Sequence, residues 1–178
     1  MTGGALAAPL RRNGLVAALS ALAGAIVVLA AVGAVHLAGG GSSRPGASAS
    51  ARAFSISAPS GWTTVHGSGG AVLRRDDGRG TVTVRRIPPV AGDLRTVARE
   101  LTAQLQRQIP GFRLVSARLG RVRAGGAFIY TFVRGNGTAQ SLTVTKVNGA
   151  TYRIDTAVPA GEPGAARQAG AAVGSFGP

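Results

Sequence analysis

The pattern of apolar and polar residues begins with a long apolar segment near the N-terminus. Residues 14–38 form a run in which His36 is the only side chain that can carry a charge. At about 1.5 Å per residue, a helix of this length is long enough to cross a hydrocarbon core about 30 Å thick. Arg11 and Arg12 precede the run and favour a cytoplasmic N-terminus. The sequence therefore predicts a transmembrane helix at residues 14–38, behind a short cytoplasmic segment at residues 1–13.

A cleaved signal peptide is the alternative interpretation of this segment. The apolar region of a signal peptide is usually about 7–15 residues long, which is shorter than this run. Ala47-Ser48-Ala49 nevertheless provides a small-residue cleavage sequence. Residues 39–51 are rich in Gly, Ser and Ala, which predicts a flexible linker. We favour the uncleaved anchor, which places the domain at residues 52–178 outside the cytoplasmic membrane, whereas cleavage would give a secreted protein.

Residues 52–178 carry strand-like alternation interrupted by a pattern with helical spacing. Strands are predicted at residues 53–57, 71–75, 81–87, 112–122, 127–134, 141–147 and 151–158. The apolar residues with helical spacing are Leu94, Val97, Ala98, Leu101, Leu105 and Ile109. Asp93 is the expected N-cap of this helix, and Pro110-Gly111 is its expected end. A shorter helix is predicted within residues 164–176.

This order of elements predicts an α+β fold. We expect an antiparallel sheet of six to seven strands, covered by one long amphipathic helix and a shorter C-terminal helix. Residues 76–80 and the pairs Asn136-Gly137 and Asn148-Gly149 are expected to form hairpin turns. Residues 127–134 place apolar or semi-polar side chains on both faces, so we expect a central strand with one face under the long helix.

Charge and composition narrow the range of partners. The chain has 20 basic and 6 acidic residues and a net charge of +14, but Lys146 is its only lysine. Abundant Arg, Ala, Gly and Val with little Lys is typical of GC-rich coding, as in actinobacteria, so the charge is weak evidence for nucleic acid. No nucleic-acid-binding motif is present either. A basic surface of this kind still attracts anionic lipids and polyanions.

The candidate functional residues are arginines rather than catalytic groups. The predicted anion-binding residues are Arg74, Arg75, Arg79, Arg85 and Arg86, around one hairpin. A solvated surface, partly neutralised by Asp76 and Asp77, is the alternative interpretation. A second basic group consists of Arg118, Arg121 and Arg123. The chain has no cysteine and only two histidines, and we predict no catalytic residue, no metal site and no cofactor.

The segment Phe54–Trp62, with the sequence FSISAPSGW, resembles the opening motif of PsbP-like domains, including the bacterial LpqN and DcrB groups. The helix and hairpins that follow it, and the closing Ser175-Phe176, are similar too. The resemblance implies a sandwich-like α/β/α domain that serves binding or assembly rather than catalysis, with Trp62 as a structural aromatic residue. It carries over no catalytic residue.

Together these observations predict a single-pass cell-membrane protein of the bacterial envelope, with a non-catalytic extracytoplasmic domain. Its expected partners are the membrane and an anionic lipid, a glycan or another envelope protein, and nucleic acid is not expected. A secreted form and an envelope enzyme with an unrecognised site are the alternatives.

Overall fold

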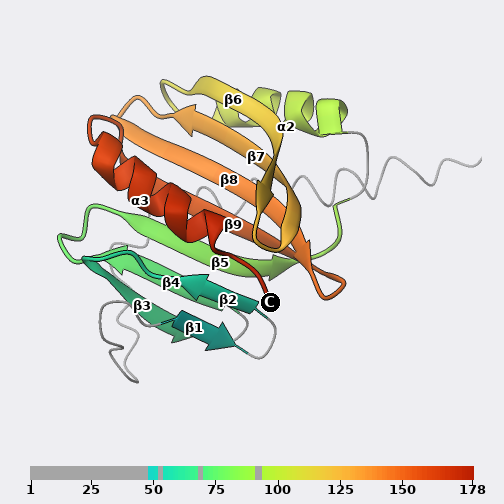
Figure 1. The fold of residues 1–178 in the computed structure, drawn as a ribbon. Helices are drawn as coiled ribbons and strands as arrows, with labels where there is room; N and C mark the ends of the chain where they lie inside the picture. Colours follow the sequence, from blue (N-terminus) through green and yellow to red (C-terminus); the bar gives the residue numbers. More distant parts are fainter. Residues whose placement is uncertain (1–47, 52–53, 68–69, 91–93) are drawn as a thin grey trace, which may run out of the picture.

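The computed structural model describes residues 48–51, 54–67, 70–90 and 94–178. Its centre is a seven-stranded antiparallel sheet with the strand order β3-β4-β5-β9-β8-β7-β6 (Figure 1). The strands are β3 (Trp62–Gly67), β4 (Gly70–Arg75), β5 (Thr81–Ile87), β6 (Arg113–Val122), β7 (Gly125–Val133), β8 (Thr138–Val147) and β9 (Ala150–Pro159). The predicted α+β class and antiparallel sheet are therefore confirmed.

Helix α2 (Leu94–Gln108) covers one face of the sheet. Its stripe of Val97, Leu101 and Leu105 is almost completely buried and packs on Phe128, Tyr130 and other apolar side chains of β7 and β8. Removing these side chains from water is the main source of the helix's stability, because an isolated helix of 15 residues is marginal in water. The predicted amphipathic helix is thus confirmed, together with its place over residues 127–134.

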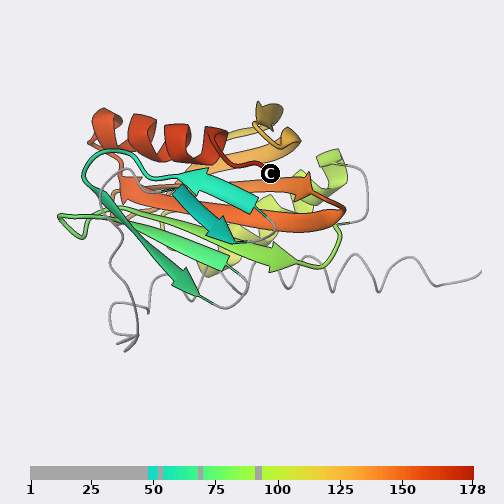
Figure 2. The ribbon, with the colours of Figure 1, turned by 60° about the horizontal axis from the view of Figure 1, so that its bottom comes forward.

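Helix α3 (Pro163–Gly174) lies on the opposite face (Figure 2). Its small buried residues, among them Ala169 and Ala172, allow the helix to pack closely on the sheet. The chain then continues to Phe176, whose ring packs with those of Phe54 and Tyr152 at centroid distances of 5.2 and 5.4 Å. This second core contains side chains of α3, of β2 and of all seven strands of the main sheet, on the face that points away from α2.

A two-stranded sheet of β1 (Ser48–Ala51) and β2 (Phe54–Ser57) is separate from the main sheet. Strand β2 is tied to the C-terminus, because the Ser55 amide donates to the Gly177 carbonyl at 2.6 Å and the Gly177 amide donates back to the Ser55 carbonyl. Strand β1 occupies the last four residues of the predicted linker 39–51, so regular pairing starts before the predicted domain boundary.

Three details differ from the sequence-based expectation. The edge strand β3 was not predicted, because its inward side chains include Thr64, which hides the apolar alternation. Strand β2, predicted within the sheet, lies outside it. Strand β7 is next to the edge strand, and β9 is the central strand. Both faces of β7 are covered, because Phe128 and Tyr130 pack under α2 and Ala127 belongs to the core under α3. A strand next to the edge can therefore carry the pattern that is typical of a central strand.

The predicted membrane helix at residues 14–38 and the predicted N-cap Asp93 lie outside the described residues. Within the described ranges, neither helix has the length and apolar character needed to cross a bilayer.

Candidate ligand-binding groove beside helix α2

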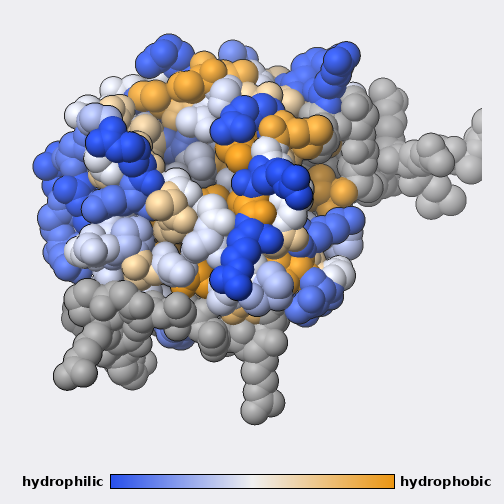
Figure 3. All heavy atoms as spheres, viewed as in Figure 1, coloured by the Kyte–Doolittle hydropathy of each residue, from blue (hydrophilic) through white to orange (hydrophobic). Residues whose placement is uncertain are grey.

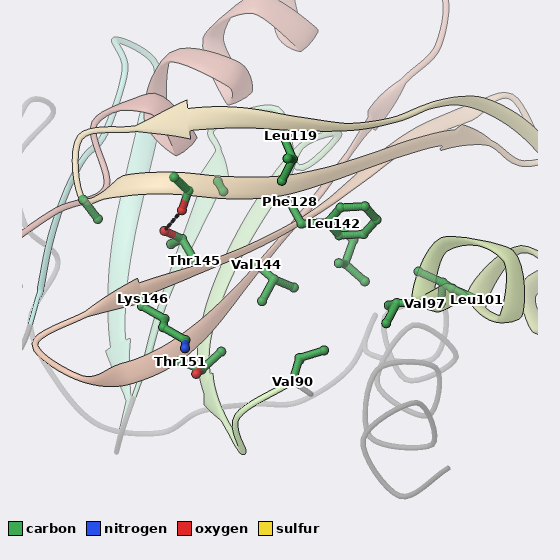
Figure 4. Close-up of a pocket in the computed structure, with 13 residues that line it drawn as sticks. Val90, Val97, Leu101, Leu119, Phe128, Leu142, Val144, Thr145, Lys146 and Thr151 are labelled. Atoms are coloured by element: carbon green, nitrogen blue, oxygen red, sulfur yellow. Dashed lines mark hydrogen bonds between the residues drawn. The ribbon is translucent and has the colours of Figure 1, made fainter. Parts of the chain in front are cut away.

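A groove opens between the N-terminal half of α2 and the sheet. It has a volume of about 400 Å³, within the range of roughly 300–1,000 Å³ that is typical of small-molecule sites. Figure 4 shows Val97 and Leu101 of α2 on one side and Phe128 and Leu142 of the sheet opposite them. The lining includes Val97 and Leu101 but not Leu105 or Ile109, which are buried at the C-terminal end of the helix and directly after it.

The wall of the groove is almost entirely apolar. In addition to the residues above, the lining side chains include Val90, Val144 and Leu119. Leu119, in β6, is 69% exposed and stands at the mouth of the groove. None of the 13 described residues that line the groove is acidic. The site therefore favours an elongated apolar group and presents no charge that would repel an anion.

Two polar side chains lie at one end of the groove. Lys146 in β8 and Thr151 in β9 are direct cross-strand partners, and Figure 4 shows both side chains together at this end. The Thr151 hydroxyl is buried and has no hydrogen-bond partner among the described residues. A buried hydroxyl without a partner costs about 1–3 kcal/mol, so a polar ligand group or a water at this position would stabilise the fold.

No pattern in the sequence predicted this groove. Its lining comes from α2, the segment before it and the four strands β6, β7, β8 and β9. In the sequence these side chains look like ordinary core residues. One signal was available: Lys146 is the only lysine in a chain with 19 arginines. The ammonium group of lysine is a compact charge on a flexible side chain, whereas the planar guanidinium of arginine binds carboxylates and phosphates through two parallel hydrogen bonds.

The predicted anion-binding arginines are divided by the structure. Arg75 hydrogen-bonds Glu162 at the start of α3 and lies 3.2 Å from Asp77, and Arg79 lies 3.1 Å from the same Glu162. The hydrogen bond with Glu162 raises the pKa of Arg75. These two arginines therefore hold the β4–β5 hairpin against α3.

The remaining three predicted arginines are exposed but do not form one surface. Arg85 and Arg86 are consecutive residues of β5 and so point to opposite faces of the sheet. Arg74 shares a face with Arg85, but the pairing of β4 with β5 separates them by four residues, about 13 Å at about 3.3 Å per residue. Anion binding by these residues remains a prediction.

Besides Arg75, the described groups with clearly shifted pKa values are Tyr130 and Asp155. Burial raises the pKa of Tyr130, and it also raises the pKa of Asp155 against the opposing effect of Arg153. Each of these groups has a structural partner: Thr102 for Tyr130 and Arg153 for Asp155. The described residues also contain no cluster of metal-ligating side chains.

Comparison with models of known protein families gives no match, and comparison with curated protein sequences gives none either. Solved structures do match. The cyanobacterial PsbP (CyanoP) from Synechocystis sp. PCC 6803 has a TM-score of 0.55 at 16% sequence identity, over 82% of this chain and 98% of that chain. LpqN of Mycobacterium tuberculosis, described as involved in cell envelope biogenesis, has a TM-score of 0.45 at 15% identity, over 76% of this chain and 87% of that one. The likeness to CyanoP shows that the chain has a PsbP-like fold.

Proposed function

We propose that this protein is a membrane-anchored, non-catalytic binding protein of the bacterial envelope, whose domain holds the acyl chain of an anionic lipid in the groove beside α2. The observation that carries the proposal is the apolar groove with Lys146 and the buried Thr151 hydroxyl at one end. An acyl chain fits the apolar walls, and an anionic head group fits the polar end.

The acyl chain would supply most of the affinity. Burial of one methylene contributes about 0.8 kcal/mol, so eight buried methylenes contribute about 6 kcal/mol before the cost of ordering the ligand. The Lys146 side chain is exposed, and an exposed ion pair contributes only about 0–1 kcal/mol. We therefore expect Lys146 to select the orientation and charge of the ligand, while the groove determines how tightly it binds.

Support for the envelope location comes from the sequence. The apolar run at residues 14–38 and the preceding Arg11 and Arg12 favour an N-terminus in the cytoplasm and the domain on the outer side of the membrane. The net charge of +14 would hold such a domain near anionic lipids. A tethered domain of this kind meets its lipid ligand at the membrane surface.

The non-catalytic part of the proposal rests on the chemistry of the groove. Catalytic sites usually contain titratable groups with perturbed pKa values, and the described groups of this kind lie elsewhere. Among the described residues that line the groove, Lys146 alone has a titratable side chain. A single exposed amine beside a threonine suits recognition of a carboxylate or phosphate, with no second group to act as an acid or base.

Photocrosslinking in membranes tests the proposal with the full-length chain. A palmitate that carries a diazirine in its acyl chain is added to membranes, and crosslinked peptides are located by mass spectrometry. We expect crosslinks at residues that line the groove. Val144→Phe narrows the groove and should reduce them at least fivefold, and Val115→Phe, at an exposed position outside the groove, should not.

The head group is tested with a second pair of variants. Lys146→Glu should weaken labelling by the anionic probe more than Lys146→Met does, because only the former introduces repulsion. A diazirine-bearing fatty alcohol should show no difference between the two variants. Crosslinks outside the groove, or labelling that is unchanged by Val144→Phe, would contradict acyl-chain binding at this site. Mass measurement of the mature chain separates the anchored form from the cleaved, secreted form.

A further inference from the structure

Strand β6 forms one edge of the main sheet, and among the described residues only its β7 side is paired. It has ten residues, most of them exposed. An open edge of this length presents a row of unpaired amide and carbonyl groups, which is a template for a further strand. The opposite edge strand, β3, has six residues.

The exposed hydrophobic surface is concentrated on this edge. Leu114, Val115 and Leu119 are 39%, 55% and 69% exposed, and they are the only large apolar residues that are exposed in the described part of the chain. Figure 3 shows apolar and strongly polar side chains together along the upper rim of the molecule, where β6 runs in Figure 1. A bulge near Val115 shifts the pairing with β7, and the strand is regular beyond it.

The two faces of β6 beyond the bulge have different chemistry. Ala117 and Leu119 pair with Tyr130 and Phe128, so they point to the α2 face of the sheet and form an apolar row. Arg118 lies between them and points to the α3 face. Arg121, two residues after Leu119, points to the α2 face as well. A strand added to this edge would therefore meet Ala117 and Leu119 followed by Arg121 on one face, and Arg118 on the other.

Charge decides which kind of strand fits. Arg113, Arg118 and Arg121 are exposed, no carboxylate lies in β6, and no ion pair to these arginines is found within the described residues. A second copy of β6 would bring three more arginines against them, and like charges on neighbouring strands are destabilising. The charges thus disfavour self-association at an edge whose apolar residues still favour association.

We infer that β6 is a docking site for an extended segment of another protein that alternates apolar and acidic residues and adds to the sheet as an eighth strand. The apolar residues of this segment contact the row that contains Leu119, and its carboxylates pair with Arg118. Main-chain hydrogen bonds supply affinity, and the alternation supplies specificity. The inference goes beyond lipid binding and does not depend on it: the two sites share Leu119 at the mouth of the groove, but Arg118, which pairs with the carboxylates of the segment, does not line the groove.

The test uses the full chain in detergent micelles and a fluorescent decapeptide that alternates valine and glutamate. We expect the peptide to bind, as measured by fluorescence anisotropy. Arg118→Glu should weaken binding at least tenfold and should allow binding of the matching valine–lysine peptide. Arg74→Glu is the control, because it makes the same charge change five strands away and should alter the affinity less than threefold.

Main-chain pairing is tested separately from charge. A decapeptide with N-methylated amides on one edge should bind at least tenfold more weakly than the unmodified peptide. Hydrogen exchange should show new protection of amides within residues 116–121 when the unmodified peptide binds. Equal weakening by Arg118→Glu and Arg74→Glu, binding that is indifferent to N-methylation, protection elsewhere, or self-association of the chain through β6 would each overturn the inference.

Discussion

The hydroxyl of Tyr130 joins the sheet to α2 through a hydrogen bond that can be tested in detail. It lies 2.7 Å from Thr102 Oγ1, and Thr102 Oγ1 in turn donates to the Ala98 carbonyl at 2.7 Å. Because the threonine proton is used in that bond, the tyrosine must be the donor. Tyr130 is completely buried, so water does not replace a lost partner.

The two single substitutions should therefore have unequal costs. Tyr130→Phe removes a donor and leaves Thr102 bonded to the helix, so it should lower the free energy of unfolding by about 1 kcal/mol. Thr102→Val leaves the tyrosine hydroxyl buried without an acceptor, which should cost about 1–3 kcal/mol. The double variant removes both polar groups, and its cost should be less than the sum of the single costs by about 1 kcal/mol.

Equilibrium urea unfolding measures these differences. Trp62 is the only tryptophan and is 1% exposed, so its fluorescence reports the loss of the folded core. The free energy of unfolding must fall with urea concentration at the same slope in all four proteins for the comparison to hold. The reasoning is refuted if Thr102→Val costs no more than Tyr130→Phe, or if the costs of the two single substitutions add.

The same tyrosine predicts a loss of stability at alkaline pH. Burial raises the pKa of Tyr130 above its ordinary value of 10.0. Above pH 10 the unfolded chain releases a proton that the folded chain retains, so the stability due to this group is complete below pH 10 and falls as the pH rises toward the folded-state value. Urea unfolding measured across this pH range should show the loss of stability in the unmodified protein. The Tyr130→Phe variant should lack the part of the loss that is due to this tyrosine.

Two further predictions concern the central strand and its hairpin. Burial raises the pKa of Asp155 above 3.8, so between 3.8 and the folded-state value stability should fall as the pH rises, and urea titrations should show that Asp155→Asn lacks this slope. Gly149 has a φ of 77° in the turn before β9, so Gly149→Ala should lower the unfolding free energy by about 1–2 kcal/mol. Gly161→Ala is the control, and it should be neutral or slightly stabilising because the added methyl meets open space. If it destabilised the protein as much as Gly149→Ala does, backbone strain at Gly149 would be excluded as the cause.

Local patterns were sufficient to predict most elements of this fold. The spacing of Val97, Leu101 and Leu105 predicted α2 because a helix brings every third or fourth residue to one face. The Asn148-Gly149 pair predicted a tight hairpin, and both residues have positive φ. Strand β3 was missed because threonine, although polar, is buried at position 64.

The amino-acid sequence by itself determined the α+β class, the long helix, the hairpins and the basic character of the chain, because these depend on neighbouring residues and on composition. Only the tertiary structure decided that β9 is central, that α2 leaves a groove which ends at Lys146, and that β6 is an open edge with exposed Leu119. The order of strands in a sheet and the space beside a helix depend on contacts between residues that are distant in the chain. The alternation of apolar and polar residues in a strand indicates which side chains face inward, but it does not indicate which helix or strand those side chains pack against.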